Sequence, residues 1–471
     1  MANEEEFDVV VIGGGPGGYA TALYGAAAGL SVAIVERDKV GGTCLHRGCI
    51  PAKEFLETAA VRRTIEGSKE FGIDVSGVAL DFARSQERKQ AVVDKLWKGL
   101  QGLLKGRKVT TFIGTGTLKE GRRVEVLDGP DAGKAITGAN VVLAAGSVPH
   151  VLPGFEVDGR WVMTSDEFLD LQKLPASVAV VGGGVVGCEF ASLLADLGSK
   201  VTILEALDAI LPGCDEDVVR LIVRSFKKRG IDIVTGVKVE SHTPSADGTV
   251  TTVKAGEQSW DVEAIVVSVG RRPRTEELVA DGVGVRIDER GFVVADEYQR
   301  TGVDGVWAVG DIVAGTPQLA HAGFAEAIVA VKGMLGETVV PVDNGKVPWA
   351  IYCHPEVAFC GMTEAQAKDA GIDVLTKKDP FGSNSRAQII GDTEGLVKIV
   401  AEKRPDGTAG RILGVHMCGP WVTEQLSGGY LAVNWEAYPD EVAQFIQPHP
   451  SLSETFGETM LALTGRGLHL G

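Results

Sequence analysis

The chain has 471 residues, and at roughly 150 residues per domain this length suggests about three domains. Apolar residues make up 44% and charged residues 23%, an ordinary globular composition that excludes disorder, collagen and coiled coil as the main architecture. With 63 acidic against 46 basic residues the formal net charge is -17, and a nucleic-acid binder with this balance would need a concentrated basic patch. Because the basic runs are as short as Lys227–Arg229, we expect no nucleic-acid partner.

Targeting and redox signals in the sequence point to the cytoplasm. Residues 1–7 carry three glutamates and no apolar run of signal-peptide length. No stretch of about 18 apolar residues lacks charge, so no membrane span is expected. Seven cysteines are an odd number and too few for a disulfide scaffold in a chain of this length. We therefore expect an acidic cytoplasmic protein in which any disulfide takes part in the chemistry.

The first motif is a glycine-rich loop between a predicted strand and a predicted helix. The pattern predicts strand, loop, helix and strand in this order: 8–12, 13–18, 19–28 and 31–35. The loop reads G-x-G-x-x-G, with Gly13, Gly15 and Gly18 at the three glycine positions. The second strand runs into Glu36.

This spacing suits a dinucleotide. The first glycine allows a tight turn, the second lets the backbone approach a pyrophosphate, and the third lets the helix pack on the strand. The helix N-terminus then faces the phosphate charge. An acid at the end of the second strand accepts a hydrogen bond from an adenosine ribose, a role that fits Glu36. One copy alone is a weak signal, because plain glycine turns in βαβ units are common.

Residues 41–53 hold two cysteines in a glycine-rich stretch, and four residues separate Cys44 from Cys49. A structural zinc site needs four ligands, and no second Cys or His pair of suitable spacing stands nearby, which argues against zinc. Two unrelated core cysteines are the other alternative. The stretch follows the first nucleotide fold directly, so we expect it to lie over the bound cofactor.

The strand, loop, helix and strand pattern recurs in the middle of the chain, over residues 177–181, 182–187, 188–197 and 200–204. Gly182, Gly184 and Gly187 occupy the glycine positions, and Glu205 ends the second strand. In both copies the glutamate lies 23 residues after the first glycine. Two copies in register predict two dinucleotide sites. Glu205 would repel a 2′-phosphate, and Ala206 and Leu207 follow it with no arginine nearby, which favours NAD over NADP at the second site.

Residues 44–51, Cys-Leu-His-Arg-Gly-Cys-Ile-Pro, resemble the redox-disulfide motif of the pyridine nucleotide–disulfide oxidoreductases, a family of flavoproteins. The motif looks most like that of the family's dihydrolipoamide dehydrogenase branch, and the resemblance covers the whole chain. It implies FAD in the first nucleotide fold and NAD in the second. It also implies that Cys44 exchanges with the substrate disulfide and that Cys49 lies against the flavin as a charge-transfer thiolate. Lys53 would lie near the flavin's reactive edge and pair with Glu189 of the second fold.

Three later segments resemble further parts of the family pattern. The strand of residues 141–143 runs into Gly146 and Ser147, which would close on FAD. Gly270 would approach the nicotinamide, and Asp311 would bind the ribityl chain of the flavin. The predicted cofactor contacts are Gly13, Gly15, Gly18, Glu36, Thr43, Lys53, Gly116, Gly146, Ser147, Asp311 and Ala320 for the first fold, and Gly182, Gly184, Gly187, Glu189, Glu205, Val239 and Gly270 for the second.

Near the C-terminus, His449-Pro450 is followed by Glu454. Such a histidine alone is more often structural. Beside a redox disulfide it has a use, because thiol–disulfide exchange needs a thiolate nucleophile and a proton for the leaving thiolate. We expect His449 to be the acid–base group and Glu454 the carboxylate that orients it. In the family this pair comes from the other subunit of a homodimer.

The sequence therefore predicts an α/β fold with two Rossmann-like dinucleotide-binding domains and an α+β dimerisation domain. We expect an FAD domain over 1–150, an NAD domain over 151–272, a central segment over 273–345 that completes the FAD site, and an interface domain over 346–471. A helix over 91–104 links the redox region to the rest of the FAD domain. We expect no resident metal.

The resemblance implies NAD-dependent oxidation of dihydrolipoyl groups, with a homodimer serving the lipoyl-bearing component of a 2-oxo acid dehydrogenase or glycine-cleavage complex. Three alternatives remain. One is a reductase of a low-molecular-weight disulfide of the glutathione or mycothiol type. Another is a mercuric reductase, which normally adds a C-terminal cysteine pair that residues 464–471 lack. The last is a non-catalytic flavin-binding protein, which needs neither the cysteine pair nor His449 and Glu454.

Overall fold

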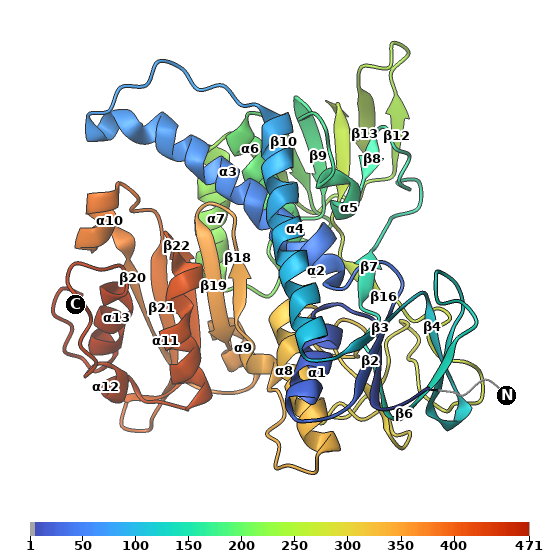
Figure 1. Cartoon of the computed structure of the whole chain (residues 1–471). Coiled ribbons are helices and arrows are strands. Elements are labelled where there is room, and N and C mark those ends of the chain that lie inside the picture. The colour runs from blue at the N-terminus through green and yellow to red at the C-terminus, as the bar shows by residue number, and fades with distance from the viewer. Residues whose placement is uncertain (1–4, 471) are drawn as a thin grey trace. The chain divides into compact units, whose positions relative to one another are not determined.

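The computed structural model describes residues 5–470 (Figure 1). These residues divide into two compact units. Unit 1 contains residues 5–54, 83–150 and 270–344, and unit 2 contains residues 55–82, 151–269 and 345–470. Each unit is described by itself below.

Unit 1 is built on a seven-stranded sheet with the order β3-β2-β1-β6-β5-β4, and β17 pairs with β6. Its strands are β1 (Glu5–Ile12), β2 (Val32–Glu36), β3 (Thr110–Ile113), β4 (Gly116–Lys119), β5 (Arg123–Val126), β6 (Ala135–Leu143) and β17 (Val306–Ala308). The pairs among β1, β2, β3, β6 and β17 are parallel, and β4 and β5 form an antiparallel edge. The last four residues of β1 are fully buried or nearly so, as expected for a central parallel strand covered on both faces.

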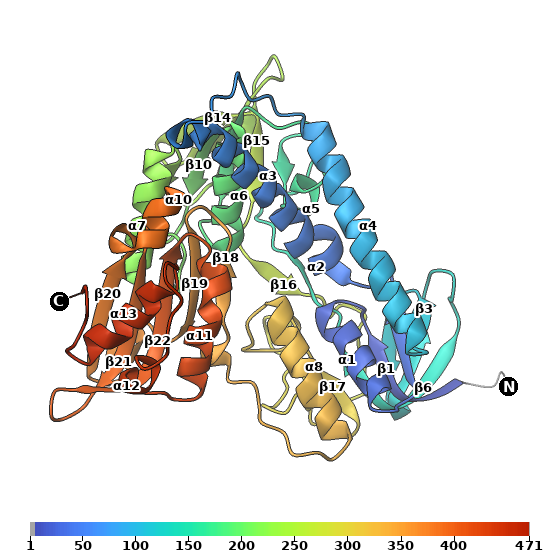
Figure 2. The same ribbon diagram turned by 60° about the vertical axis from the view of Figure 1, so that its left-hand side comes forward.

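The helices of unit 1 position its loops against this sheet. They are α1 (Pro16–Ala27), α2 (Gly42–Arg47), the start of α3 (Cys49–Gly67), nearly all of α4 (Phe82–Gly106) and α8 (Ala320–Met334). Helices α1 and α8 pack side by side, as both ribbon views show (Figure 2). A two-stranded antiparallel ribbon joins β7 (Ser147–Pro149) to β16 (Arg271–Pro273).

In unit 2, a five-stranded parallel sheet has the order β11-β10-β9-β15-β8. Its strands are β8 (Val162–Met163), β9 (Ser177–Val181), β10 (Lys200–Leu204), β11 (Asp232–Val234) and β15 (Ala264–Val267). Its helices are α5 (Ser165–Phe168), α6 (Val185–Leu197) and α7 (Glu216–Lys228). Three antiparallel strands, β12 (Ser241–Pro244), β13 (Thr251–Ala255) and β14 (Gln258–Val262), form a separate small sheet.

The remainder of unit 2 is a five-stranded antiparallel sheet with the order β18-β19-β22-β21-β20. Its strands are β18 (Trp349–Ile351), β19 (Glu356–Gly361), β20 (Val374–Pro380), β21 (Leu396–Lys403) and β22 (Ala409–Gly419). Its helices are α9 (Glu364–Asp369), α10 (Ser385–Ile390), α11 (Val422–Asn434), α12 (Pro439–Val442) and α13 (Glu454–Leu463). Helices α11 and α13 pack on this sheet, and their apolar residues share one core with it.

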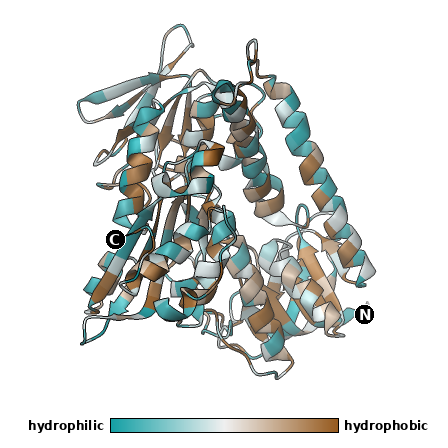
Figure 3. Ribbon diagram, turned by 90° about the vertical axis from the view of Figure 1, so that its left-hand side faces the viewer, coloured by the Kyte–Doolittle hydropathy of each residue, from teal (hydrophilic) through white to brown (hydrophobic). Residues whose placement is uncertain are grey.

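The predicted α/β fold class is confirmed. The two strand pairs of the internal repeat are β1 and β2 in unit 1 and β9 and β10 in unit 2. Figure 3 shows that strands near the N-terminus are largely hydrophobic, whereas the helices alternate between hydrophilic and hydrophobic segments. The helix predicted over 91–104 is longer and forms α4 over 82–106. Within residues 5–470, no helix is both long and apolar enough to cross a membrane.

Candidate active site

The first glycine-rich loop has the backbone that a dinucleotide site needs. Gly13 has a φ of +105°, and a Cβ placed there would lie 2.3 Å from the carbonyl oxygen of Ala144. A Cβ on Gly18 would lie 1.9 Å from the carbonyl oxygen of Gly13, so no side chain fits where α1 meets β1. Nothing lies within 4 Å of the corresponding point on Gly15. The loop is therefore tight on the protein side and open on the side that a pyrophosphate would approach.

The second loop repeats this geometry in unit 2. Gly182 has a φ of +104°, and a Cβ there would lie 2.5 Å from the carbonyl oxygen of Ser268. A Cβ on Gly187 would lie 1.9 Å from the carbonyl oxygen of Gly182, and the corresponding point on Gly184 is open. Helices α1 and α6 both begin after a glycine N-cap, without a capping side chain or an acidic residue in the first turn. Both helix N-termini therefore fit a phosphate group.

The two glutamates at the strand ends are held in the same way. The carboxylate of Glu36 accepts the N–H of Gly14 at 2.6 Å and the N–H of Asp38 at 2.8 Å. Glu205 accepts the N–H of Gly183 at 2.6 Å and the N–H of Leu207 at 2.7 Å. A carboxylate has about four acceptor positions, so each retains capacity for ribose hydroxyls. The residues present thus fit two dinucleotides.

The structure brings Cys44 and Cys49 together. Cys44 lies within α2 and Cys49 begins α3, with Gly48 between the two helices. The two thiols are hydrogen-bonded to one another, and this bond, followed by burial, raises the pKa of Cys44 well above its ordinary value. Cys44 is partly buried and Cys49 is exposed. They are therefore close enough to form a disulfide with one another.

Other ionisable groups of unit 1 face the cysteine pair. The charge of Lys53 lowers the pKa of Cys44 and the charge of Asp311 raises it, although both effects are smaller than that of the bond to Cys49. Burial, followed by the charges of the two cysteines, raises the pKa of Tyr19 to about 12. Lys53 and Asp311 were predicted from the sequence and Tyr19 was not. Its signal was its position directly after the last glycine of the first loop.

Asp311 lies in a hydrogen-bonded cluster that the sequence did not reveal. One of its carboxylate oxygens accepts the hydroxyl of Ser147 at 2.5 Å, and that hydroxyl accepts the Nε–H of Arg271 at 2.7 Å. The N–H of Gly310 donates to Glu326 at 2.5 Å. The other oxygen of Glu326 is buried and has no hydrogen-bond partner among residues 5–470. Burial, together with the charge of Asp311, raises the pKa of Glu326 to about 7 against the hydrogen bond from Gly310.

His449 and Glu454 form the predicted pair in unit 2. Nδ1 of His449 lies 2.8 Å from Oε1 of Glu454, and the N–H of Ser451 donates to Oε2 at 2.7 Å. The imidazole is largely exposed, with 72% of its side-chain surface accessible. The hydrogen bonds from Ser451 and His449 outweigh the effect of burial and lower the pKa of Glu454. This arrangement leaves Nε2 of His449 available to exchange protons.

The remaining predicted residues lie in the unit that holds their fold, with one exception: Gly270 was predicted for the second fold but belongs to unit 1. Glu189 is 3% exposed on α6 and accepts the backbone N–H of Tyr352 at 2.9 Å. Val239 packs against an apolar core of unit 2. In unit 1, Thr43 is in α2, Gly116 is the first residue of β4, Ala320 is the first residue of α8, and Gly146 and Gly270 flank the β7–β16 ribbon.

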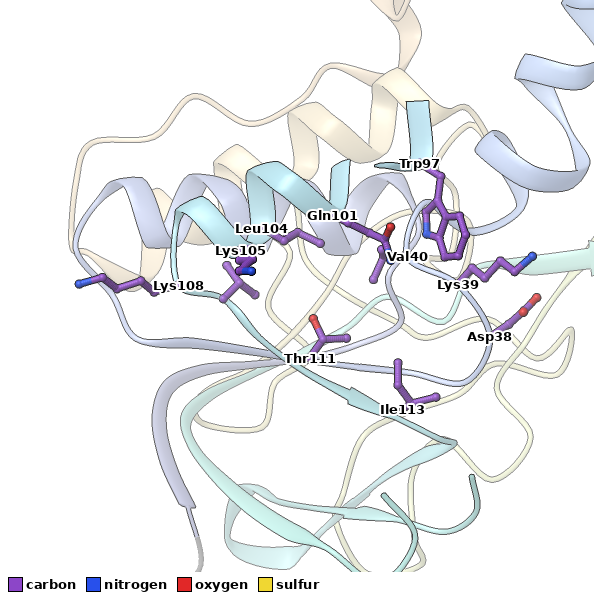
Figure 4. Close-up of a pocket in the computed structure, with 11 residues that line it drawn as sticks. Asp38, Lys39, Val40, Trp97, Gln101, Leu104, Lys105, Lys108, Thr111 and Ile113 are labelled. Atoms are coloured by element: carbon purple, nitrogen blue, oxygen red, sulfur yellow. The ribbon is translucent and has the colours of Figure 1, made fainter. Parts of the chain in front are cut away.

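Unit 1 also has a surface pocket of about 500 Å³ (Figure 4). It is lined by Asp38, Lys39, Val40, Trp97, Gln101, Leu104, Lys105, Lys108, Val109, Thr111 and Ile113. None of these lining residues was predicted as a site residue. Asp38 is the link to the nucleotide loop, since its N–H donates to Glu36. Trp97 is the link to the redox segment, since its ring packs edge-on against His46 of α2.

Comparison with known proteins identifies the family. The sequence pattern described as pyridine nucleotide-disulphide oxidoreductase matches residues 7–327, and the pattern for the dimerisation domain of the same family matches residues 347–460. The chain belongs to the pyridine nucleotide-disulphide oxidoreductase family. It is therefore an oxidoreductase with a dimerisation domain, and this domain supports a homodimer.

Relatives within this oxidoreductase family match over the full length. A dihydrolipoyl dehydrogenase of Bacillus subtilis is 41% identical, over 98% of this chain and 99% of its own. One from Geobacillus stearothermophilus is 36% identical, over 99% and 98%. The structure of RclA from Escherichia coli, an HOCl-induced flavoprotein disulfide reductase, has a TM-score of 0.85 and 28% identity, over 96% of this chain and 99% of its own. LpdA from Mycobacterium tuberculosis, with a TM-score of 0.89, 24% identity and coverage of 98% and 99%, shows the same fold.

Proposed function

We propose that this oxidoreductase is a dihydrolipoyl dehydrogenase that uses FAD and NAD. The observation that carries the proposal is the hydrogen-bonded Cys44 and Cys49 pair, placed in the same unit as the first dinucleotide loop. Full-length relatives named dihydrolipoyl dehydrogenase support the substrate class. The carboxylate of Glu205 supports NAD at the second loop, because a 2′-phosphate beside it would be repelled.

The residues would act in a thiol relay. His449 takes a proton from one thiol of the dihydrolipoyl group, and the resulting thiolate attacks the sulfur of Cys44. In the oxidised enzyme Cys44 and Cys49 form a disulfide, and this attack breaks its S–S bond, so that a mixed disulfide forms at Cys44 and Cys49 leaves as a thiolate. The second substrate thiol then attacks the substrate sulfur of the mixed disulfide and its proton passes to the leaving sulfur of Cys44, so that the lipoyl disulfide forms while the first proton stays on His449. When bound, FAD would supply the redox chemistry of the relay, since it can take the electron pair from the cysteines and pass it to NAD as a hydride.

Each supporting residue has a defined task in this proposal. Glu454 keeps its charge because its pKa is lowered, so it can stabilise the imidazolium that forms when His449 accepts a proton. Lys53, in the first turns of α3, places a positive charge near the cysteine pair. Asp311 offers a carboxylate to the ribityl hydroxyls of FAD, and Glu189 is the proposed partner of Lys53.

We further propose the setting in which the homodimer works. Its partner is the lipoyl-bearing component of a 2-oxo acid dehydrogenase or glycine-cleavage complex, and its compartment is the cytoplasm. The five cysteines outside the redox pair are free thiols within residues 5–470, which suits a reducing compartment. The division into regions over 1–150, 151–272, 273–345 and 346–471 is part of the proposal.

NADH oxidation by the purified protein against lipoamide, glutathione disulfide and mycothiol disulfide tests the substrate. Lipoamide far ahead of the others is expected, and preference for another disulfide would replace the proposed substrate. The variant Cys49→Ser should lose turnover with lipoamide. Cys214→Ser, which removes a partly buried thiol outside the site, is the matched control and should retain it. Full turnover in Cys49→Ser would contradict the relay.

A further inference from the structure

A hydrogen-bonded chain links the β7–β16 ribbon to Asp311. Arg271 begins β16, and its Nε–H donates to the hydroxyl of Ser147 at 2.7 Å while its Nη2–H donates to the carbonyl of Ser147 at 2.9 Å. The hydroxyl of Ser147 donates its own hydrogen to Oδ2 of Asp311 at 2.5 Å. The three residues come from distant parts of the sequence, yet all belong to unit 1.

The direction of these bonds is fixed by chemistry. A guanidinium can only donate, and an ionised carboxylate can only accept. The hydroxyl of Ser147 therefore has to accept from Arg271 and donate to Asp311. Ser147 is 5% exposed, so water competes little for this position. A positive charge at one end and a negative charge at the other strengthen both bonds.

The hydrogen bonds from Arg271 through Ser147 leave the two carboxylate oxygens of Asp311 in different states. Oδ2 is occupied by Ser147, and no residue within the described part of the chain donates to Oδ1. The backbone around Asp311 is also held, because the N–H of Gly310 donates to Glu326 and the amide of Gln318 reaches the carbonyl of Asp311 at 3.4 Å. The carboxylate thus has one fixed orientation and one oxygen that can accept a ligand hydroxyl.

We propose that Arg271 is a positioning residue for the flavin, which acts through Ser147 to aim the free oxygen of Asp311 at a hydroxyl of the ribityl chain. This inference rests on the proposed use of FAD. A purely structural alternative is that Arg271 only closes the ribbon between β7 and β16. That ribbon also has its own backbone pairing, Arg271 with Pro149 and Pro273 with Ser147. The two explanations differ in whether the effect of Arg271 depends on Asp311.

The test measures the dissociation constant of FAD with flavin-free protein, by quenching of flavin fluorescence. Arg271→Met should weaken FAD binding by about tenfold, Ser147→Ala by a similar factor, and Arg271→Lys by less, because hydrogen bonds to charged groups are among the stronger ones. Arg272→Met is the matched control. Its guanidinium pairs at the surface with Glu276, so FAD affinity should not change.

A double-mutant cycle separates positioning from structure. In an Asp311→Asn background, Arg271→Met should add little further loss of FAD affinity. An equal loss in both backgrounds, or unchanged affinity in Arg271→Met alone, would overturn the inference. The proposed function fails in a different way. Wild-type protein that does not bind FAD defeats both proposals, whereas wild-type protein that binds FAD but does not turn over lipoamide defeats only the substrate.

Discussion

Glu454 is held so that both of its oxygens have a task. One oxygen accepts the N–H of Ser451 and the other lies 2.8 Å from Nδ1 of His449. Burial alone would raise the pKa of this carboxyl, but the hydrogen bonds lower it, so Glu454 remains ionised at neutral pH. An ionised partner on Nδ1 fixes the ring and favours a proton on Nε2 during catalysis.

Removing either member of this pair should reduce turnover. His449→Gln should lower kcat with lipoamide by about 10²- to 10⁴-fold, the usual contribution of a positioned acid–base group. Glu454→Gln should also lower kcat, by a smaller factor, because the imidazolium that forms during catalysis loses its counter-charge. Glu458→Gln, one turn later on α13, is the control and should leave kcat unchanged. An unaltered kcat in Glu454→Gln would remove this residue from the mechanism.

Glu326 predicts a pH dependence of stability. Its pKa rises from an ordinary 4.5 to about 7, chiefly through burial, so the folded state binds a proton more tightly than the unfolded state. Its contribution is fully favourable below pH 4.5 and is lost as the pH rises towards 7. Glu326→Gln should therefore gain stability over wild type across this range, by up to about 3 kcal/mol at pH 8. Unfolding curves between pH 5 and 8 measure it, with exposed Glu337→Gln as control. Parallel wild-type and Glu326→Gln curves would contradict the expected titration.

Candidate site residues could be identified from the sequence where their pattern lies within one short segment. Cys44 and Cys49, and the two glutamates at the strand ends, follow from local spacing. Arg271 and Glu326 were not predictable, because their partners Ser147 and Gly310 are brought to them only by the fold. Arg271 and Arg272 are neighbours in the sequence, yet the first arginine bonds to Ser147 and the second to Glu276.

At the scale of elements, the predicted strands 177–181 and 200–204 match β9 and β10, because each is a largely apolar run with glycine near one end, Gly182 after β9 and Gly198 before β10. Helices α1 and α6 begin three residues before their predicted starts, at Pro16 and Val185. In both copies the last three residues of the glycine-rich loop already belong to the first helical turn. Helix α2 was not predicted, since a short glycine-flanked segment has too little periodicity to indicate a helix.

Lys398 joins three elements of unit 2 through buried charge. It lies on β21, is 2% exposed, and contacts Asp215 at 3.0 Å, Asp217 at 2.8 Å and Glu364 at 2.8 Å, at the N-termini of α7 and α9. The hydrogen bonds from Lys398 and its neighbours lower the pKa of Asp217 against the effect of burial, and those from Lys368 and Lys398 lower that of Glu364. These carboxylates therefore stabilise the fold above their unfolded pKa and lose that effect as the pH falls.

Replacing this lysine should destabilise unit 2 in a pH-dependent way. Lys398→Met leaves the carboxylates without their shared cation and should cost about 3–5 kcal/mol at pH 7. The loss should shrink as the pH falls below about 4, because the carboxylates then become protonated in the unfolded chain while their lowered pKa keeps them ionised in the folded wild type. Lys378→Met is the control, because its side chain is 49% exposed and pairs with Asp217 at the surface, so it should cost at most about 1 kcal/mol. A pH-independent loss in Lys398→Met would point to packing in place of charge.

For the whole molecule, the sequence predicted the fold class more completely than it predicted the candidate site. Two glycine loops in register predicted two dinucleotide folds, and both are present. The C-terminal antiparallel sheet gave only a mixed pattern, because strands such as β21 are buried for most of their length and lack polar alternation. The predicted catalytic residues also fall in different units, with the cysteines in unit 1 and His449 and Glu454 in unit 2.

Subunit complementation decides whether His449 serves its own chain or the partner of the homodimer. A heterodimer of one Cys44→Ser chain and one His449→Gln chain, isolated with two affinity tags, keeps one complete site if the histidine acts across the interface. It should then show about half of the wild-type activity per dimer, although each parent homodimer is inactive.

The reciprocal heterodimer supplies the control. It pairs a wild-type chain with a chain that carries both Cys44→Ser and His449→Gln. Action across the interface leaves this dimer without a complete site, since each intact cysteine faces a substituted histidine. Action within one chain predicts the opposite pair of results, an inactive first heterodimer and a half-active second one. Because the two dimers contain the same substitutions in different chains, a general loss of stability cannot account for activity in only one of them.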